Sequence, residues 1–142
     1  MMKHLAVIAM IALFPAGMNC ANQTTPTVKI PLTKTTPTSG KQMYMSYCTP
    51  CHGQDGKGQG PVASALKSQP IDLTTLARNN NGKFPAIHVT AVLQNGVNIP
   101  AHGSAAMPVW GPILGKMDVT NPLDRDLRIS NLSHYLRSMQ EK

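Results

Sequence analysis

The chain has 142 residues and a formal charge of +7, and 42% of its residues are hydrophobic although only 4% are aromatic. This length allows one domain or two very small ones, and a charged fraction of 13% argues against a coiled coil and a highly charged disordered protein. Six aromatic rings leave a small domain short of large apolar groups for its core. We therefore expect another large group to fill the centre.

The N-terminus has the pattern of an export signal. Lys3 precedes an apolar run from Leu5 to Phe14, which has the length of a signal-peptide core and is too short to span a bilayer. We predict a signal peptide over residues 1–20. Its removal leaves twelve basic and six acidic residues, a formal charge of +6.

Cys20 gives the end of this signal a second interpretation. In bacterial lipoproteins a lipidated Cys is the first mature residue, but here Gly17 and Asn19 stand where that motif has a large aliphatic residue and a small one. A lipid anchor on Cys20 and an unpaired Cys that leaves with the signal are both kept as interpretations.

A Thr- and Pro-rich segment follows. Residues 22–38 hold seven Thr and three Pro and no run of large apolar side chains. Because Pro lacks an amide donor and fixes the backbone, we predict an exposed linker over residues 21–38. The globular domain is then expected over residues 39–142.

The first predicted helix spans residues 40–48, with Ser39 as its N-cap and the Thr49-Pro50 pair as its end. A second helix spans Pro85 to Asn95 and stops at Gly96. Between them we expect a glycine-rich loop over residues 53–60, one or two helical turns over residues 61–66 and a turn capped by Asp72.

The last predicted helix has the strongest periodicity. Asn121 is its predicted N-cap and Pro122 its first residue, after an ordered loop over residues 97–117. Apolar side chains recur at steps of three or four residues and form one stripe: Ile129, Leu132, Leu136 and Met139, with Tyr135 beside them. No period-two run of β-branched residues competes, so the predicted fold class is all-α.

The residues that carry chemistry are Cys48-Thr49-Pro50-Cys51-His52. C-x-x-C-H is the attachment signature of a c-type haem. The two thiols add to the vinyl groups of one porphyrin, and the imidazole of the adjacent His52 ligates the iron. We therefore predict one covalent haem c, held by Cys48 and Cys51.

Three other interpretations of this motif compete with haem attachment. A thioredoxin-type redox pair tolerates Pro before the second Cys but should follow a strand in a βαβ context, which is missing here. A zinc site needs two further ligands, and the donors that remain, His88, His102 and His134, are scattered singly. The third alternative is a structural disulfide between residues three apart.

Met107 is the predicted second axial ligand of the iron. It lies in a loop bounded by Gly and Pro, where a side chain can be aimed across a ring. A thioether opposite His favours ferrous iron and raises the reduction potential relative to bis-His ligation. Met117 is the rival thioether, and His88 or His102 would give bis-His ligation.

These features resemble a class I (mitochondrial-type) monohaem cytochrome c of the small bacterial periplasmic kind, over residues 39–142. Gly40, Tyr44 and Cys48 follow one another at steps of four, as in the N-terminal helix of that family, and residues 132–136 match its L-x-x-Y-L pattern. The resemblance implies an all-α cytochrome c fold whose N- and C-terminal helices cross, with Gly40 against Tyr135.

The resemblance also covers the loop from His52 to Pro61. In the family a Pro carbonyl accepts a hydrogen bond from the second nitrogen of the ligand His, which fixes the ring. By analogy Pro61 has that role. Haem propionates need donors or cations, and the candidates in this sequence are Arg78, Lys83 and Trp110.

The implied function is one-electron transfer in the periplasm, without enzymatic catalysis and with His52 and Met107 bound to the iron throughout. The competing function is a five-coordinate haem sensor or a peroxidase-like protein, with Met107 displaced. Two ionised propionates would lower the charge of +6 to about +4, which favours redox partners with acidic docking surfaces. We expect a monomer that binds no nucleic acid and has no spanning helix in its mature form.

Overall fold

The computed structural model describes residues 32–96, 107–118, 121 and 123–141. The predictions for the signal peptide, Cys20, His102 and Pro122 lie outside these residues. In chain order the elements are α1 (Gly40–Met43), the π-helical turn η1 (Tyr44–Cys48), α2 (Thr49–His52), the 3-10 turns η2 (Ala63–Ala65), η3 (Leu73–Thr75) and η4 (Arg78–Asn80), α3 (Ala86–Asn95), α4 (Trp110–Gly115) and α5 (Asp124–Ser138). The described part of the chain contains no strand, which confirms the predicted all-α class. None of its helices has the length and hydropathy needed to cross a membrane.

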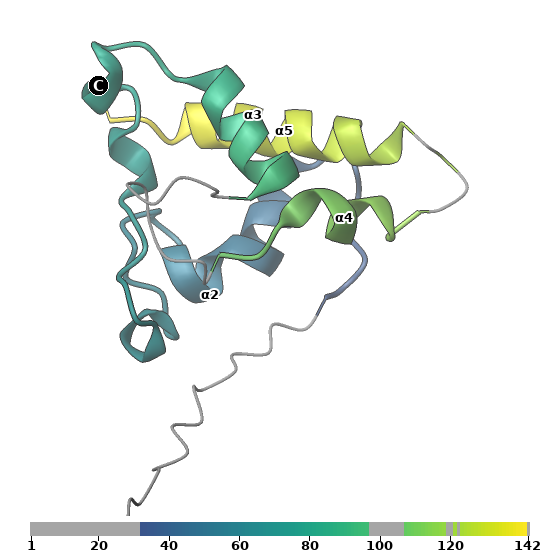
Figure 1. Ribbon diagram of the computed structural model, residues 1–142, viewed down its shortest axis with the longest axis horizontal. Helices are drawn as coiled ribbons and strands as arrows, with labels where there is room; N and C mark the ends of the chain where they lie inside the picture. The colour runs from purple at the N-terminus through teal and green to yellow at the C-terminus, as the bar shows by residue number, and fades with distance from the viewer. Residues whose placement is uncertain (1–31, 97–106, 119–120, 122, 142) are drawn as a thin grey trace, which may run out of the picture.

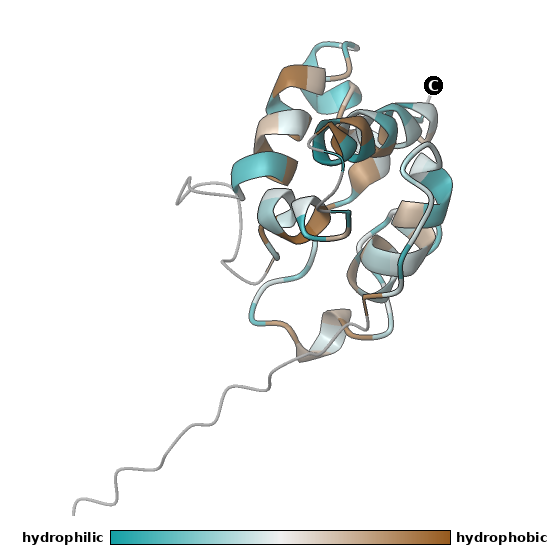
Figure 2. Ribbon diagram, turned by 90° about the vertical axis from the view of Figure 1, so that its right-hand side faces the viewer, coloured by the Kyte–Doolittle hydropathy of each residue, from teal (hydrophilic) through white to brown (hydrophobic). Residues whose placement is uncertain are grey.

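The helix α5 is the element on which the other helices pack. It runs across the molecule in Figure 1, and α1, α3 and α4 all contact it. Figure 2 looks along α5 and shows the other helices gathered around it. Ile129, Leu132 and Leu136 are buried, and Tyr135 and Met139 are partly buried against the same core. The predicted apolar stripe is therefore confirmed.

Two predicted N-caps, Ser39 and Asp72, are confirmed and one is corrected. The Ser39 hydroxyl accepts a hydrogen bond from the amide of Gln42 at 3.2 Å, at the start of α1. The helix α5 begins at Asp124 with Leu123 as its cap residue, two positions later than Asn121. The Asn121 side chain instead accepts from the Leu123 amide at 3.1 Å, so it closes the turn before the helix.

The crossing of α1 over α5 depends on Gly40. A Cβ at this position would lie 2.1 Å from the carbonyl oxygen of Asn131 and 2.9 Å from the Cβ of Tyr135. Both separations are shorter than van der Waals contact, so the two backbones can approach this closely only at a glycine. The predicted contact between Gly40 and Tyr135 is confirmed.

The first helical segment is longer than predicted. It does not end at the Thr49-Pro50 pair but continues through η1 and α2 to His52. In a π-helical turn the carbonyl of Met45 would accept from residue 50, which is a Pro and has no amide hydrogen. The Thr49 hydroxyl donates to that carbonyl instead, at 2.7 Å. The Thr-Pro pair is thus accommodated within the segment, with Pro50 in the first turn of α2.

The helix α4 lies where the sequence predicts a loop. Gly111 and Pro112 suggest a break, but both occupy its first turn, where neither interrupts a hydrogen bond. A Cβ on Gly111 would lie 2.3 Å from the carbonyl oxygen of Gln94. The glycine therefore permits close packing of α4 on the end of α3, and the loop prediction is wrong over these residues.

The segment before Ser39 is not wholly an exposed linker. Thr35 is only 4% exposed, and Nη1 of the buried Arg128 donates to its carbonyl and hydroxyl oxygens at 2.9 and 3.0 Å. The Thr35 hydroxyl also lies 2.9 Å from the hydroxyl of Tyr47. Arg128 is paired in turn with the buried carboxylate of Asp124. The folded domain therefore includes residues that precede Ser39.

Replacement of Gly40 tests the close crossing. Gly40→Ala should lower the free energy of unfolding by about 1–3 kcal/mol, because the new methyl group overlaps the backbone of Asn131. Gly115→Ala in α4 is the matched control, since a Cβ there would lie 3.5 Å from the Arg125 side chain. Urea unfolding followed by circular dichroism measures both variants. Equal stability of the two would contradict the crossing.

Replacement of Arg128 tests the buried ion pair. Arg128→Met should lower the free energy of unfolding by about 3–5 kcal/mol, because Asp124 is left buried without a counter-charge. Arg125→Met is the control, because the side chains of Arg125 and its partner Asp126 are 50% and 53% exposed. It should lower the free energy of unfolding by less than about 1 kcal/mol. A loss for Arg128→Met no larger than that of the control would show that the pair contributes nothing.

Candidate haem-attachment site

Cys48, Cys51 and His52 lie together at the junction of η1 and α2. Cys48 ends the π-helical turn, and the other two residues occupy the last positions of α2. Cys48 is buried, whereas Cys51 and His52 are partly exposed. The two thiols are not joined in a disulfide. Two thiols three positions apart in one continuous helical segment have the spacing for attachment to a single porphyrin edge.

The glycine-rich loop holds the C-terminal end of α2. Amides of the loop donate to carbonyls that the helix leaves without partners: Gly58 to His52 at 2.8 Å, Gly60 to Cys51 at 3.0 Å and Val62 to Pro50 at 3.0 Å. Gly58 has a φ of +77°, a conformation that favours glycine. The loop therefore holds the backbone of Cys51 and His52 directly.

The partner of the His52 ring differs from the prediction. His52 Nδ1 lies 3.3 Å from the carbonyl oxygen of Ile71, so Ile71 and not Pro61 supplies this acceptor. A Cβ on Gly58 would lie 2.1 Å from the carbonyl oxygen of Pro70. The backbone at Pro70 and Ile71 can therefore approach the site this closely only because residue 58 is a glycine. A Cβ on Gly60 would likewise lie 2.3 Å from the carbonyl of Pro50, which places Pro61 beside the start of α2.

The surroundings of His52 favour the neutral form of its imidazole. Burial lowers the pKa of its imidazole, and the hydrogen bond to the Ile71 carbonyl partly opposes this shift. The neutral ring is the form that ligates metals. With Nδ1 directed to the Ile71 carbonyl, Nε2 is the nitrogen left for iron.

The two thiols differ from those of a dithiol redox centre. Burial, and to a lesser degree the neighbouring Cys51, raises the pKa of Cys48 to about 12. Burial also raises the pKa of Cys51. Thioredoxin-type centres work through a thiolate with a lowered pKa and follow a strand, which the described residues lack. The geometry therefore opposes the thiol-oxidoreductase alternative.

The described residues provide no set of ligands for a zinc ion. Among the described residues no three His, Cys, Asp or Glu side chains gather at one place. His88 and His134 are exposed on α3 and α5, respectively. The donor set at the motif, two thiols and one neutral imidazole, fits covalent attachment and axial ligation of a haem.

Aromatic residues pack next to the C-x-x-C-H motif. Tyr44 donates to the carbonyl of Gly53 at 2.7 Å, and its ring centroid lies 5.3 Å from that of Tyr135. Tyr47, directly before Cys48, stacks on Trp110 with centroids 5.6 Å apart. Sequence reasoning did not assign Tyr47 a role in the site, although its position next to Cys48 was the available signal.

The structure separates the two candidate thioethers. Met107 is partly buried against the core and begins the segment that leads into α4. Two residues later, Val109 is held against the end of α3, since a Cβ on Gly96 would lie 2.7 Å from its Cγ2. Met117 Sδ instead lies 3.4 Å from the Tyr47 hydroxyl, which donates its one hydrogen to the carbonyl of Thr33. Met107 as iron ligand stays a prediction, and Met117 is packed beside Tyr47.

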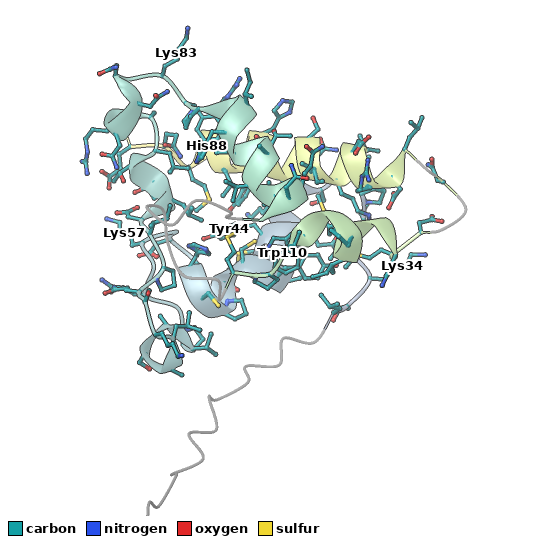
Figure 3. All side chains as sticks on the ribbon, in the orientation of Figure 1. Lys34, Tyr44, Lys57, Lys83, His88 and Trp110 are labelled. Atoms are coloured by element: carbon teal, nitrogen blue, oxygen red, sulfur yellow. The ribbon has the colours of Figure 1, made fainter. Side chains whose placement is uncertain are left out.

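The three propionate candidates have different surroundings. Arg78 pairs with Glu141 at 3.1 Å and its side chain is 67% exposed. Trp110 is buried in the core, and Lys83 is exposed. Figure 3 shows Trp110 inside the molecule and Lys83 at its edge. Which of them meets a propionate stays a prediction.

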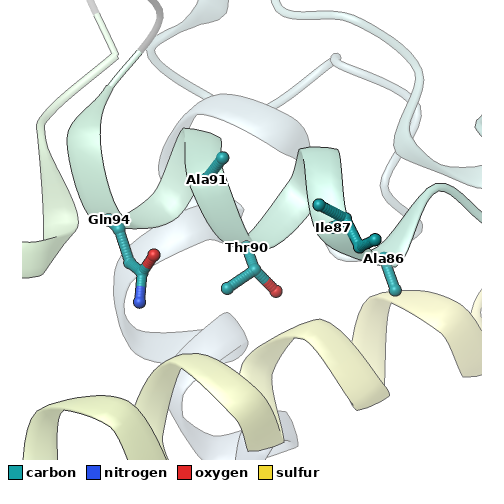
Figure 4. A pocket seen from close by; sticks show the side chains of 5 residues that line it. All are labelled: Ala86, Ile87, Thr90, Ala91 and Gln94. Carbon is teal, nitrogen blue, oxygen red and sulfur yellow. The ribbon is translucent and has the colours of Figure 1, made fainter.

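Two surface hollows lie away from Cys48, Cys51 and His52. One of about 350 Å³ on α3 is lined by Ala86, Ile87, Thr90, Ala91 and Gln94, with Thr90 and Gln94 directed toward α5 (Figure 4). Another of about 360 Å³ continues from it between α3 and α5. Neither includes a residue of the motif, so neither is the functional site.

The family comparison agrees with this chemistry. The family described as Cytochrome C oxidase, cbb3-type, subunit III matches residues 35–121, more than half of the chain. The match includes the C-x-x-C-H motif and begins at the buried Thr35. A search of curated proteins gives no match. The chain therefore belongs to this family and is a monohaem c-type cytochrome, an electron-transfer protein that binds its haem covalently.

Proposed function

We propose that the protein is a class I cytochrome c that shuttles single electrons in the periplasm, between a membrane or periplasmic reductase and an oxidase or terminal reductase. The bound haem supplies exchange of one electron between ferric and ferrous iron. Cys48 and Cys51 hold it as thioethers, and His52 and Met107 are its axial ligands. We assign the protein no enzymatic activity.

The arrangement of Cys48, Cys51 and His52 on one helical segment carries this proposal. The glycine-rich loop holds the backbone of Cys51 and His52, and the His52 ring has one nitrogen near the Ile71 carbonyl. A ligand whose ring orientation is set before the electron arrives needs little rearrangement when the iron changes charge. That favours fast electron exchange over chemistry at an open coordination position.

Met107 is favoured as the second ligand by the contacts of its rival. The Met117 sulfur lies 3.4 Å from the hydroxyl of Tyr47, whose ring is stacked on Trp110. Moving Met117 to the iron would remove it from this packing against the core. Met107 comes three residues before Trp110, and the packing of Val109 on Gly96 anchors the chain beside it.

Periplasmic location rests on the signal peptide predicted over residues 1–20 and on the export that is typical of cytochrome c domains. The description of the matched family supports a second candidate function, a haem subunit within a larger oxidase assembly. The two candidates differ in native size, since the carrier is expected as a monomer.

The positive charge of the protein is spread over several edges. Figure 3 shows Lys34, Lys57 and Lys83 at separate edges of the molecule. Lys57 and Arg78 share the carboxylate of Glu141 at 3.5 and 3.1 Å. Lys57 is in the loop directly after His52, so it is the lysine that we propose to act on a partner approaching this end of the domain.

The ferric optical spectrum tests the axial ligands. The wild-type protein should be low-spin with a charge-transfer band from Met sulfur to iron, and Met107→Ala should lose this band and become high-spin, because it removes the sulfur. Met117→Ala is the matched control and should keep the band. A pyridine haemochrome assay of the denatured, reduced protein checks covalent attachment to Cys48 and Cys51. A high-spin spectrum of the native wild type would favour the five-coordinate sensor instead.

Salt dependence tests the role of charge. The rate constant for oxidation by the anion ferricyanide should fall as ionic strength rises, and the rate constant for reduction by the cation hexaammineruthenium(II) should increase. Lys57→Gln should lower the ferricyanide rate constant at low salt by about twofold, and the control Lys34→Gln should change it less. Stopped-flow absorbance measures each rate. Rates that are independent of salt would count against steering.

A further inference from the structure

Gln140 and Glu141 are hydrogen-bonded to the segment of residues 71–77, whose Ile71 carbonyl lies near the His52 ring. Gln140 Nε2 donates to the carbonyl of Leu73 at 2.7 Å, and Gln140 Oε1 accepts from the amide of Ala77 at 2.8 Å. We call these two contacts the C-terminal junction. They join residues more than sixty positions apart, so they fix one end of the segment in space.

The Gln140 side chain is held in one orientation. Its Nε2 also donates to the carbonyl of Leu136, at 2.8 Å, at the end of α5. Both polar atoms of the amide therefore have partners, and the side chain is half-buried. Next to it, the Glu141 amide donates to the carbonyl of Thr74 at 2.9 Å. The contact between α5 and the segment is thus continuous over two residues.

A hydrogen-bonded turn at Asp72 and Thr74 links the position of Leu73 to that of Ile71. The carboxylate of Asp72 accepts from the amide and the hydroxyl of Thr74 at 2.8 and 2.6 Å. The Leu73 amide donates to the carbonyl of Gly56 at 2.8 Å, on the loop side. Because these bonds close the turn internally, a displacement of Leu73 also displaces the carbonyl of Ile71.

We propose that Gln140 is a positioning residue for His52: through the C-terminal junction it keeps the Ile71 carbonyl in reach of His52 Nδ1. The inference rests on the proposed role of His52 as axial ligand. A ligand imidazole whose second nitrogen donates a hydrogen bond is more basic, and a more basic ligand stabilises ferric iron. Loss of the C-terminal junction therefore raises the reduction potential.

The test is equilibrium redox titration of the holoprotein with Gln140→Leu, which removes all three hydrogen bonds of the Gln140 side chain without changing charge. We expect the ratio of ferrous to ferric protein at a fixed ambient potential to increase several-fold, a tenfold increase being about 59 mV. The spectrum should stay low-spin with one covalent haem. Gln140→Met, with an unbranched side chain of similar length, should shift the ratio in the same direction.

Gln42→Leu is the matched control. The Gln42 side chain accepts from the amide of Thr36 at 2.9 Å, so the same substitution removes the same kind of bond at a place that does not involve Leu73 or Ala77. It should change stability and leave the potential unchanged. An equal rise of the potential in the control would reduce the role of Gln140 to general stability and overturn the proposal.

Two further outcomes separate this proposal from the function on which it rests. An unchanged potential in a Gln140 variant that keeps its low-spin spectrum overturns the positioning role and leaves the electron carrier intact. Rapid hydrogen exchange of the Ala77 amide in the folded wild type also overturns it, without any variant. A wild-type spectrum that lacks His ligation would instead overturn the proposed function.

Discussion

The approach of two backbones at Gly40 and Asn131 is the contact on which the rest of the structure depends. The helical segment that begins at Gly40 runs without a break to His52, about 18 Å at 1.5 Å per residue. Fixing its first residue on α5 therefore fixes the direction along which the two thiols and the imidazole are presented. The C-terminal end of the same helix α5 meets the segment that places a carbonyl near the His52 ring. One helix thus contacts both the segment that carries His52 and the segment whose carbonyl lies near its ring.

The buried pair of Arg128 and Asp124 adds a second attachment to α5. Desolvation makes a buried ion pair a weak source of net stability, but its bonds are directional. Arg128 reaches back to Thr35, which meets the hydroxyl of Tyr47 in the middle of the first helical segment. Tyr47 in turn stacks on Trp110 at the start of α4. The pair therefore links the N-terminal residues, the haem-binding helix and the segment that contains Met107.

The sequence predicted those parts of the molecule whose signals are local. Periodic apolar residues indicated α5, Ser39 indicated the start of α1, and the C-x-x-C-H spacing indicated the haem. Three of the errors concern contacts between distant residues. Gly111 and Pro112 were expected to break a helix. The sequence does not show that Gly111 lies against the backbone of Gln94, a contact that only the fold reveals. Pro61 was expected by analogy with the family, and spacing along the chain does not show that Gly58 lies against the backbone at Pro70 and Ile71. Thr35 looked like linker because its partner, Arg128, is 93 positions away.

The use of the aromatic residues explains how so few of them suffice. All five rings that follow the predicted signal lie in the described part of the chain, and each is engaged between elements: Tyr44 with Tyr135, Tyr47 with Trp110, and Phe84 beneath the guanidinium of Arg137. The longest helix has 15 residues, and helices of this length or shorter are marginal without tertiary packing. Since the rings serve the contacts between helices, the composition offers few other large apolar groups for the core. The covalent porphyrin of a c-type cytochrome adds such a group to a domain that is short of them.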